Sequence, residues 1–195
     1  MDYSQIAAQL WPALTGYFAD YDSTRDLGRG TAFPASADVR DGLTAGDRFW
    51  RSDLGFLCYY DGTRWLTVHE YESGHVLVST AVNGTQSAIR ANGATYASYI
   101  TRVVCVVRVS TTNNGSNFWS IAVRGLNDAL TVATTIQTFS TVAAAVNTFV
   151  RGEANPPSTQ VPANYSAFDI ALTFGAGSPG VIDVTTTIYY RLIIT

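Results

Sequence analysis

The chain has two histidines, and both lie in one short acidic stretch, HEYESGH at residues 69–75, whose side chains are of types that bind metal ions. A metalloprotease helix places its two histidines at positions i and i+4 on one face, whereas His69 and His75 are six residues apart with Gly74 between them. We therefore interpret the stretch as an exposed polar loop between two β domains. A weak metal site built from Glu70, Glu72 and His75 is the alternative.

Residue types used in catalysis occur, but not in catalytic patterns. The sequence has no G-x-S-x-G turn, no phosphate-binding P-loop and no C-x-x-C pair. Its aspartates lie in turns, where they are typical of local backbone hydrogen bonding, as at Asp47, Asp53, Asp61 and Asp128. We expect no enzyme activity, no cofactor and no metal. A depolymerase-type glycosidase is a third alternative, although nothing singles out two carboxylates for it.

The charge composition argues against nucleic acid as a partner, and the N-terminal sequence argues against a membrane. Charged residues make up 14% of the chain, the formal net charge is −3, and all 12 basic residues are arginines. Nucleic-acid binding needs a basic stripe that neutralises phosphates, and none is present. The first residues lack a basic region followed by a long apolar run, so we expect neither a signal peptide nor membrane insertion.

Aromatic side chains near turn signals are candidates for ligand binding. Rings at loop tips stack on sugars or on partner proteins, and Tyr96, Tyr99 and Tyr165 have such positions. The alternative for these rings is ordinary packing within the fold or at subunit interfaces. For Trp50 and Trp65 we favour that second interpretation.

The sequence of the N-terminal residues 1–36 predicts an attachment arm. Apolar residues at helical spacing occur at Ile6, Leu10 and Leu14, although Pro12 would interrupt a helix, so we expect a short helix or an arm. Residues 20–44 show no sustained period and are predicted to lie on a neighbouring chain or another protein. Residues 1–36 are accordingly assigned to an N-terminal attachment arm.

Residues 37–72 predict a three-stranded β-meander. The runs RFWR, FLCYY and TRWLTV are separated by the turn signals SDLG and DG. Asp61-Gly62 predicts a two-residue type I′ hairpin, which would place Cys58 opposite Trp65. Both faces of this meander are apolar, so each face needs cover from the arm, the following domain or a symmetry mate.

Residues 73–195 predict about eight strands in an antiparallel, jelly-roll-like β-sandwich, and the whole chain is therefore assigned to the all-β class. FDIALTF at 168–174 alternates between apolar and polar positions, as a half-buried strand does. Residues 128–145 fit either a strand or a helix, and their threonine and valine content favours a strand.

The run TRVVCVVRV at 101–109 has two apolar faces. Val103, Cys105, Val107 and Val109 form the core face, and Cys105, like Cys58, is interpreted as a buried thiol. The opposite face shows an apolar pair between two arginines, which is typical of a contact surface. A strand covered by a loop of its own chain explains the pattern equally well. The residues of this opposite face are Arg102, Val104, Val106 and Arg108.

The stretch RDGLTAGDRFWRSDLGFLCYYDGTRWL at residues 40–66 resembles a short hairpin module of tailed-bacteriophage structural proteins, which occurs in tail fibres, minor tail proteins, and neck and head fibres. The resemblance covers about 30 residues and implies a virion component, commonly a homotrimer, in which the module joins an attachment segment to a distal β domain. No catalytic residues come with it. The matching positions are Gly46, Asp47, Arg48, Ser52, Asp53, Gly55, Tyr60, Asp61, Gly62, Thr63 and Trp65.

The residues and the resemblance together predict a virion structural protein that attaches by its N-terminal arm and projects a β-sandwich. The expected partners are further copies of the chain and other virion proteins. The alternative is a domain that binds a host receptor or glycan. The interface candidates are Ile6, Leu10, Trp11, Arg48, Trp50, Tyr59, Trp65, Arg102, Val104, Val106 and Arg108.

Overall fold

The computed structural model describes residues 25–73, 76–82, 84–90, 96–126, 131–155, 167–174, 177 and 180–195. The chain divides into two compact units, Met1–Val68 together with Ile194–Thr195, and His69–Ile193. The corresponding boundary predicted from the sequence follows residue 72, four residues further along the chain. The helix or arm expected at residues 3–18 lies outside the described residues.

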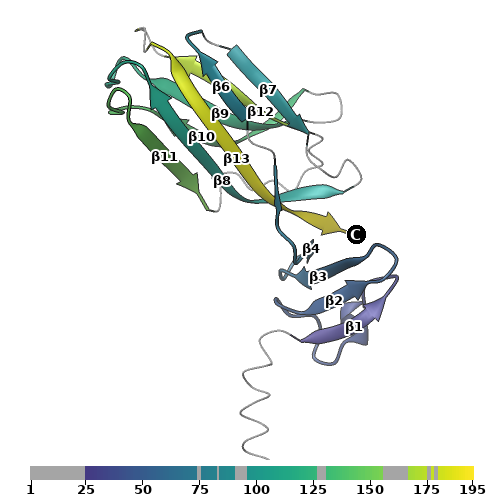
Figure 1. The fold of residues 1–195 in the computed structure, drawn as a ribbon. Helices are drawn as coiled ribbons and strands as arrows, with labels where there is room; N and C mark the ends of the chain where they lie inside the picture. Colours follow the sequence, from purple (N-terminus) through teal and green to yellow (C-terminus); the bar gives the residue numbers. More distant parts are fainter. Residues whose placement is uncertain are drawn as a thin grey trace, which may run out of the picture. The chain divides into compact units, whose positions relative to one another are not determined.

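The first unit contains the predicted meander. Strands β2 (Arg48–Arg51), β3 (Phe56–Tyr60) and β4 (Trp65–Thr67) pair antiparallel in chain order (Figure 1). A further strand, β1 (Asp26–Gly30), pairs parallel with β2, and a single turn of 3-10 helix, η1, covers Ser36–Asp38. In the described ranges no helix has the length and apolar character needed to cross a membrane.

The expectation that residues 20–44 lack regular structure is wrong for β1 and η1. Strand pairing uses backbone groups, so β1 forms although its sequence, DLGRG, has no apolar period. The Arg48 N–H donates to the Arg25 carbonyl at 2.7 Å. A register irregularity follows, where Gly28 has a φ of +89° and its N–H donates to the Asp26 carboxylate. Such an irregularity interrupts the period-two pattern of the side chains, so the strand cannot be recognised from that pattern.

The predicted type I′ hairpin and its register are also wrong. Tyr60 pairs with Trp65 and Cys58 with Thr67, so the loop has four residues and the register differs by two. The Asp61 carboxylate accepts the N–H groups of Thr63 and Arg64, each at 2.8 Å, which closes a wider turn. Because the shift is even, each side chain keeps its predicted face of the sheet.

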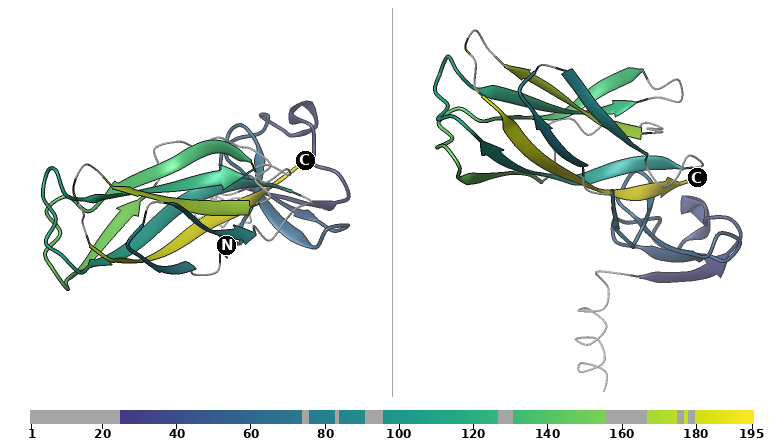
Figure 2. Two further views of the ribbon diagram at one scale, coloured as in Figure 1. Left: turned by 90° about the horizontal axis from the view of Figure 1, so that it is seen from above. Right: turned by 45° about the horizontal axis from the view of Figure 1, so that its top comes forward.

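The second unit is a sandwich of two antiparallel sheets. One sheet has the order β6-β13-β8-β11, with the short β5 also beside β13, and the other has the order β10-β9-β12-β7. Figure 2 shows the two sheets as separate layers. Apart from β9 and β10, which are neighbours in one sheet, successive strands from β6 to β13 alternate between the two sheets, which is the order of a jelly roll and confirms the predicted all-β sandwich. The strands are β5 (Tyr71–Glu72), β6 (Val76–Thr80), β7 (Gly84–Arg90), β8 (Ala97–Val109), β9 (Trp119–Leu126), β10 (Val132–Ser140), β11 (Phe149–Ala154), β12 (Ala167–Phe174) and β13 (Ile182–Ile194).

The core of this sandwich lies between the two sheets and takes alternate side chains from each. β8 contributes Cys105, Val107 and Val109, and the facing strands contribute residues such as Trp119 and Ile170, all buried. The alternation predicted for residues 168–174 is confirmed, with Phe168, Ile170 and Leu172 fully buried. The ambiguous stretch is a strand from Val132 to Ser140, as favoured, and turns follow it.

Candidate interaction surfaces

A buried ion pair fixes the start of the meander. The Arg25 guanidinium donates two hydrogen bonds to the Asp47 carboxylate, from Nε at 2.8 Å and from Nη2 at 2.7 Å. Asp47 is only 1% exposed, and the backbone N–H of Thr44 also donates to it. The Arg25 hydrogen bonds hold the pKa of Asp47 below its ordinary value, although burial alone would raise it. The same guanidinium donates to the carbonyls of Arg40 and Gly42, so one side chain secures the whole loop.

One face of the meander is covered from within the first unit. The Phe33 ring stacks on Trp65 with ring centroids 4.5 Å apart and planes at 2°, and Phe49 packs beside both rings. The Arg51 guanidinium lies over the Phe33 ring at 4.8 Å, and its Nη1 donates to the Thr195 carbonyl at 3.2 Å. The segment before the meander, which contains Phe33, therefore covers this face. It is one of the three covers expected from the sequence. Trp65 is a core residue and not a surface residue.

The opposite face of the meander carries three of the interface candidates. Trp50 and Leu57 lie directly opposite each other across β2 and β3, and they are 41% and 37% exposed. Arg48 is exposed and lies opposite the half-buried Tyr59 on the same face. The structure thus brings Arg48, Trp50 and Tyr59 together with Leu57, which the sequence analysis did not include among its candidates.

The outer face of β8 carries the other described candidates. Arg102 pairs with Glu153 at 3.6 Å and lies over the Tyr189 ring at 3.8 Å. At the other end of the row, the Arg108 guanidinium donates to Asp183 at 2.9 Å from Nε.

The carboxyl of Asp183 has its pKa lowered by hydrogen bonds from Ser79 and then from Arg108. Between these ion pairs, Val104 and Val106 are half-buried. Charged side chains of neighbouring strands therefore border the apolar pair, and neither valine is among the exposed large apolar residues of the described chain.

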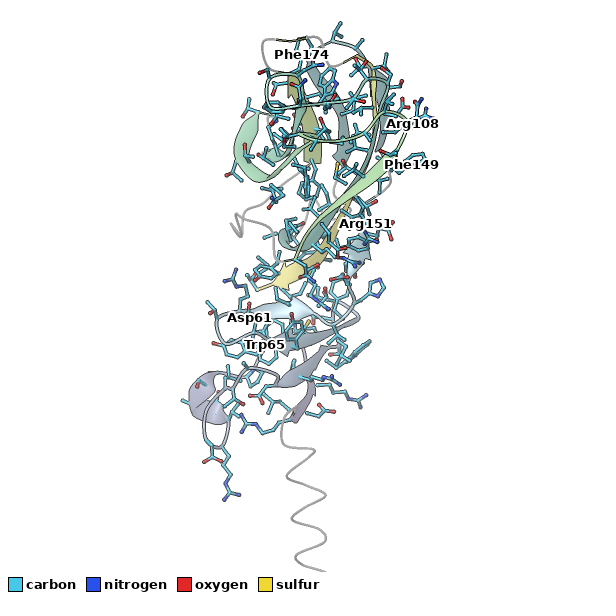
Figure 3. All side chains as sticks on the ribbon, turned by 90° about the vertical axis from the view of Figure 1, so that its left-hand side faces the viewer. Asp61, Trp65, Arg108, Phe149, Arg151 and Phe174 are labelled. Atoms are coloured by element: carbon cyan, nitrogen blue, oxygen red, sulfur yellow. The ribbon has the colours of Figure 1, made fainter. Side chains whose placement is uncertain are left out.

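The next strand, β11, carries an apolar side chain that the sequence analysis missed. Phe149 is 72% exposed, and its neighbour Val150 is also exposed. Figure 3 shows Phe149, Arg108 and Arg151 together along one side of the sandwich. Arg151 pairs with Glu153 at 2.6 Å on the same strand. The available signal was the spacing of two between Phe149, Arg151 and Glu153, which places the three side chains on one face of a strand.

The histidine-containing stretch forms no metal site in the described part of the chain. No group of three His, Cys, Asp or Glu side chains able to hold an ion occurs among the described residues, and His75 lies outside them. His69 packs edge-on against Tyr71 with ring centroids 4.6 Å apart. The Glu70 carboxylate accepts a hydrogen bond from Thr101 at 2.6 Å. Both side chains therefore have structural contacts.

The aromatic ligand candidates do not gather at one described site. Tyr96 and Tyr99 are half-buried near the start of β8, and each has further contacts within the structure. Tyr165 lies outside the described residues, as do the interface candidates Ile6, Leu10 and Trp11.

The two cysteines are buried thiols, as predicted. Both are fully buried and neither forms a disulfide. Burial raises the pKa of each thiol to about 11, because a thiolate loses hydration in apolar surroundings. Thiols with so high a pKa are poor nucleophiles at neutral pH, so neither cysteine is a candidate for catalysis.

A glycine pattern between β12 and β13 also lacks the structural context for chemistry. Residues 175–180, GAGSPG, match the glycine spacing of dinucleotide-binding loops. Those loops lead from a strand into a helix within a parallel sheet. Here the pattern connects strands of two different antiparallel sheets, and β13 follows it directly. The strands that flank the pattern therefore do not have the arrangement of a dinucleotide-binding site.

No protein-family model matches the chain, and no curated protein matches it. Among solved structures, the chain is similar to one titled as the cyanophage Pam1 capsid asymmetric unit, with 14% identity over 63% of this chain and 84% of that chain, at a TM-score of 0.38. The VP2 subviral particle of infectious bursal disease virus matches with 10% identity over 80% of this chain and 42% of that chain, at 0.40.

The insecticidal delta-endotoxin Cry8Ea1 from Bacillus thuringiensis matches with 14% identity over 61% of this chain, at a TM-score of 0.38. The chain spans about a fifth of the endotoxin and less than half of VP2. Similarities as distant as these assign no function to the chain.

Proposed function

We propose that the protein is a structural component of a tailed-bacteriophage virion, of the fibre, tail or decoration type, which attaches through its N-terminal segment and presents the jelly-roll unit. Its expected partners are two further copies of the chain, in a homotrimer, and other virion proteins. It has no catalytic role in this proposal.

The observation that supports this role is the structural use of the residues that match the phage module. Gly46, Gly55 and Gly62 have φ values of +100°, +72° and +98°, which side-chain-bearing residues rarely adopt. Asp47 is held by Arg25, and Trp65 lies in the core of the unit. Each of these residues builds a turn or fixes a strand. These five residues of the matched set therefore specify a shape, as expected of a module shared by structural proteins.

Self-association is supported by the apolar side chains that remain on the surface. Trp50 in the first unit and Phe149 in the second are large and exposed, and exposed apolar patches mark interaction sites when they are contiguous. An arginine lies beside each of them, Arg48 on the same face of β2 as Trp50 and Arg108 over the Phe149 ring, and arginine together with aromatic residues is the composition typical of protein interfaces. Symmetric homo-oligomers bury such patches against copies of themselves.

Two measurements test the proposal. Native mass spectrometry of the full chain should show a trimer of 21.0 kDa subunits, and a monomer at micromolar concentration would contradict the trimer. Immunogold electron microscopy of phage particles released by cells that carry the gene should label the particle at a fixed position. Particles without label, with the protein free in the lysate, would contradict the virion role.

A further inference from the structure

The outward face of the meander in the first unit carries that unit's two exposed large apolar residues, among those that the structure describes. They are Trp50 and Leu57, which pair directly across β2 and β3. Arg29 pairs with Trp50 across β1 and β2, and Arg48 lies two residues before Trp50 on the same face. We call these four residues the Trp50 face. It is apolar at its centre and basic along one side.

The two arginines of the Trp50 face are exposed and differ from the buried and partly buried arginines of the unit. Arg25, Arg51 and Arg64 each pair with an aspartate, at 2.7 Å, 3.0 Å and 3.3 Å. For Arg29 and Arg48, no carboxylate lies within salt-bridge distance among the described residues, although Asp26 is the strand neighbour of Arg48. The face therefore presents unneutralised positive charge beside exposed apolar area.

Residues 1–24 have the complementary composition. They contain Asp2, Asp20 and Asp22 and no arginine, whereas the remainder of the chain has 12 acidic residues and 12 arginines. The entire formal charge of −3 thus belongs to this segment. Its apolar residues recur at helical spacing, which predicts one apolar face when the segment is helical. They are Ile6, Leu10, Leu14 and Tyr17.

The connection to the unit is short enough for the segment to reach the face. The described chain begins at Arg25, and Asp26 lies beside Arg48 at the start of β1. Paired strands are about 4.8 Å apart, so the row from β1 to β3 spans roughly 10 Å. Asp20 and Asp22 lie three to five residues before Arg25, a distance that extended chain covers at about 3.3 Å per residue.

We propose that residues 1–24 dock on the Trp50 face of their own unit. The apolar residues of the segment cover Trp50 and Leu57, and Asp20 and Asp22 lie beside Arg48 and Arg29. This docking goes beyond the proposed virion role and does not depend on it. A segment held on its own unit has to be released before it binds another protein, so the Trp50 face would compete with the attachment partner.

Hydrogen exchange with mass spectrometry on the full chain tests the docking. In the wild-type protein at low salt, amides in residues 5–20 should exchange at least about tenfold more slowly than in a Trp50→Ser, Arg48→Gln variant. A tenfold change corresponds to about 1.4 kcal/mol of docking free energy. High salt should reduce the protection, because part of the attraction is between exposed charges. The matched control is Phe149→Ser, Arg151→Gln on β11, which changes the same chemistry in the other unit and should leave the protection unchanged.

Three results would overturn the proposal. Residues 1–24 that exchange as an unstructured peptide in the wild type would show that no docking occurs. Equal protection in the wild type and the Trp50→Ser, Arg48→Gln variant would place the docking site elsewhere. Protection that disappears on dilution, together with dissociation in light scattering, would show that the segment docks on another copy. The Arg29→Gln, Arg48→Gln variant keeps Trp50 and Leu57 and therefore controls for unfolding caused by the Trp50→Ser change. In this variant the amide protection of residues 5–20 should lose most of its dependence on salt.

Discussion

Asp47 illustrates how a single carboxylate holds the first unit together. It is buried, and its negative charge is matched by Arg25 and by the backbone N–H of Thr44. Because the folded protein stabilises the ionised form, the pKa of Asp47 lies below its ordinary value of 3.8. The resulting stability is fully present at pH values above about 4 and is lost as the pH falls through the folded-state pKa.

We expect Asp47→Asn to lower the stability of the first unit at neutral pH and to flatten its decline in acid. The amide cannot carry the charge that Arg25 neutralises, and so Arg25 loses its partner in a partly buried site. Urea unfolding followed from neutral pH to pH 3 would measure both effects. Asp41→Asn is the control, because the Asp41 side chain is 83% exposed. An acid dependence identical to that of the wild type would show that Asp47 does not govern it.

Gly62 is a second residue on which the first unit depends, because of its backbone conformation in the turn between β3 and β4. Its φ of +98° is strained for any residue with a side chain, although an added Cβ would meet only the Ala45 side chain, at 3.8 Å. Gly62→Val should therefore destabilise the unit by about 1–3 kcal/mol through backbone strain alone. Thr63→Val, at the next position, is the control and has no such strain. Equal midpoints in urea for the two variants would contradict this account.

At the scale of elements, an ion pair joins β9 to β12 across the sheet. Asp169 and Arg124 are register partners, and the guanidinium donates from Nε at 2.7 Å and from Nη2 at 2.6 Å. The Asp169 side chain is buried. Removal of the carboxylate alone leaves the partly buried Arg124 guanidinium without this counter-charge. The double variant Arg124→Ala, Asp169→Ala should therefore cost less stability than the sum of the two single variants, because each single variant alone already loses the ion pair.

A double-mutant cycle measures this coupling. We expect an interaction free energy on the order of 1–3 kcal/mol between Arg124 and Asp169, the range found for contacting partners. The exposed Arg151–Glu153 pair provides a matched cycle, which should give about 0–1 kcal/mol because solvent screens it. Equal coupling in the two cycles would mean that burial adds nothing to the inner pair.

The elements differ in how well the sequence predicts them, for physical reasons. The strands of the sandwich were predictable because one side of each faces a core, so that buried apolar residues recur with period two within a strand, as Phe168, Ile170 and Leu172 do in β12. β1 was not predictable, because it is held by backbone hydrogen bonds and interrupted at Gly28. The hairpin register was missed because the Asp61 side chain caps a longer loop than the Asp-Gly pair indicates.

The exposed faces were likewise predictable only where they follow from alternation within the strands of the meander. The face with Arg48 and Trp50 was predictable from alternation within the meander. The exposure of Phe149 was not, because it depends on β11 pairing with β8 in the outer row of the sheet. Similarly, Trp65 looked like a surface candidate until the structure placed Phe33 on it, 32 residues earlier in the chain. Contacts distant in sequence decide which side of an apolar strand remains exposed.

At the scale of the whole molecule, the two compact units have separate cores. Trp65 packs with Phe33 and Phe49 in the first, and Trp119 packs with Phe174 in the second. We expect calorimetry to resolve two transitions. Trp65→Ala should lower only the first unit's transition and Trp119→Ala only the second's, each by about 3–5 kcal/mol of unfolding free energy. A single transition that both variants shift equally would show that the units unfold as one.

The strand order of the sandwich also has a consequence for biosynthesis. β13 lies between β6 and β8 and pairs with both, yet the ribosome makes it after every other strand of the sandwich. Until it emerges, β6 and β8 each present an open edge in a newly made chain, and open edges invite pairing with other chains. The jelly roll therefore closes only late in translation. Its yield in cells should depend on the time that the nascent chain spends waiting for its central strand.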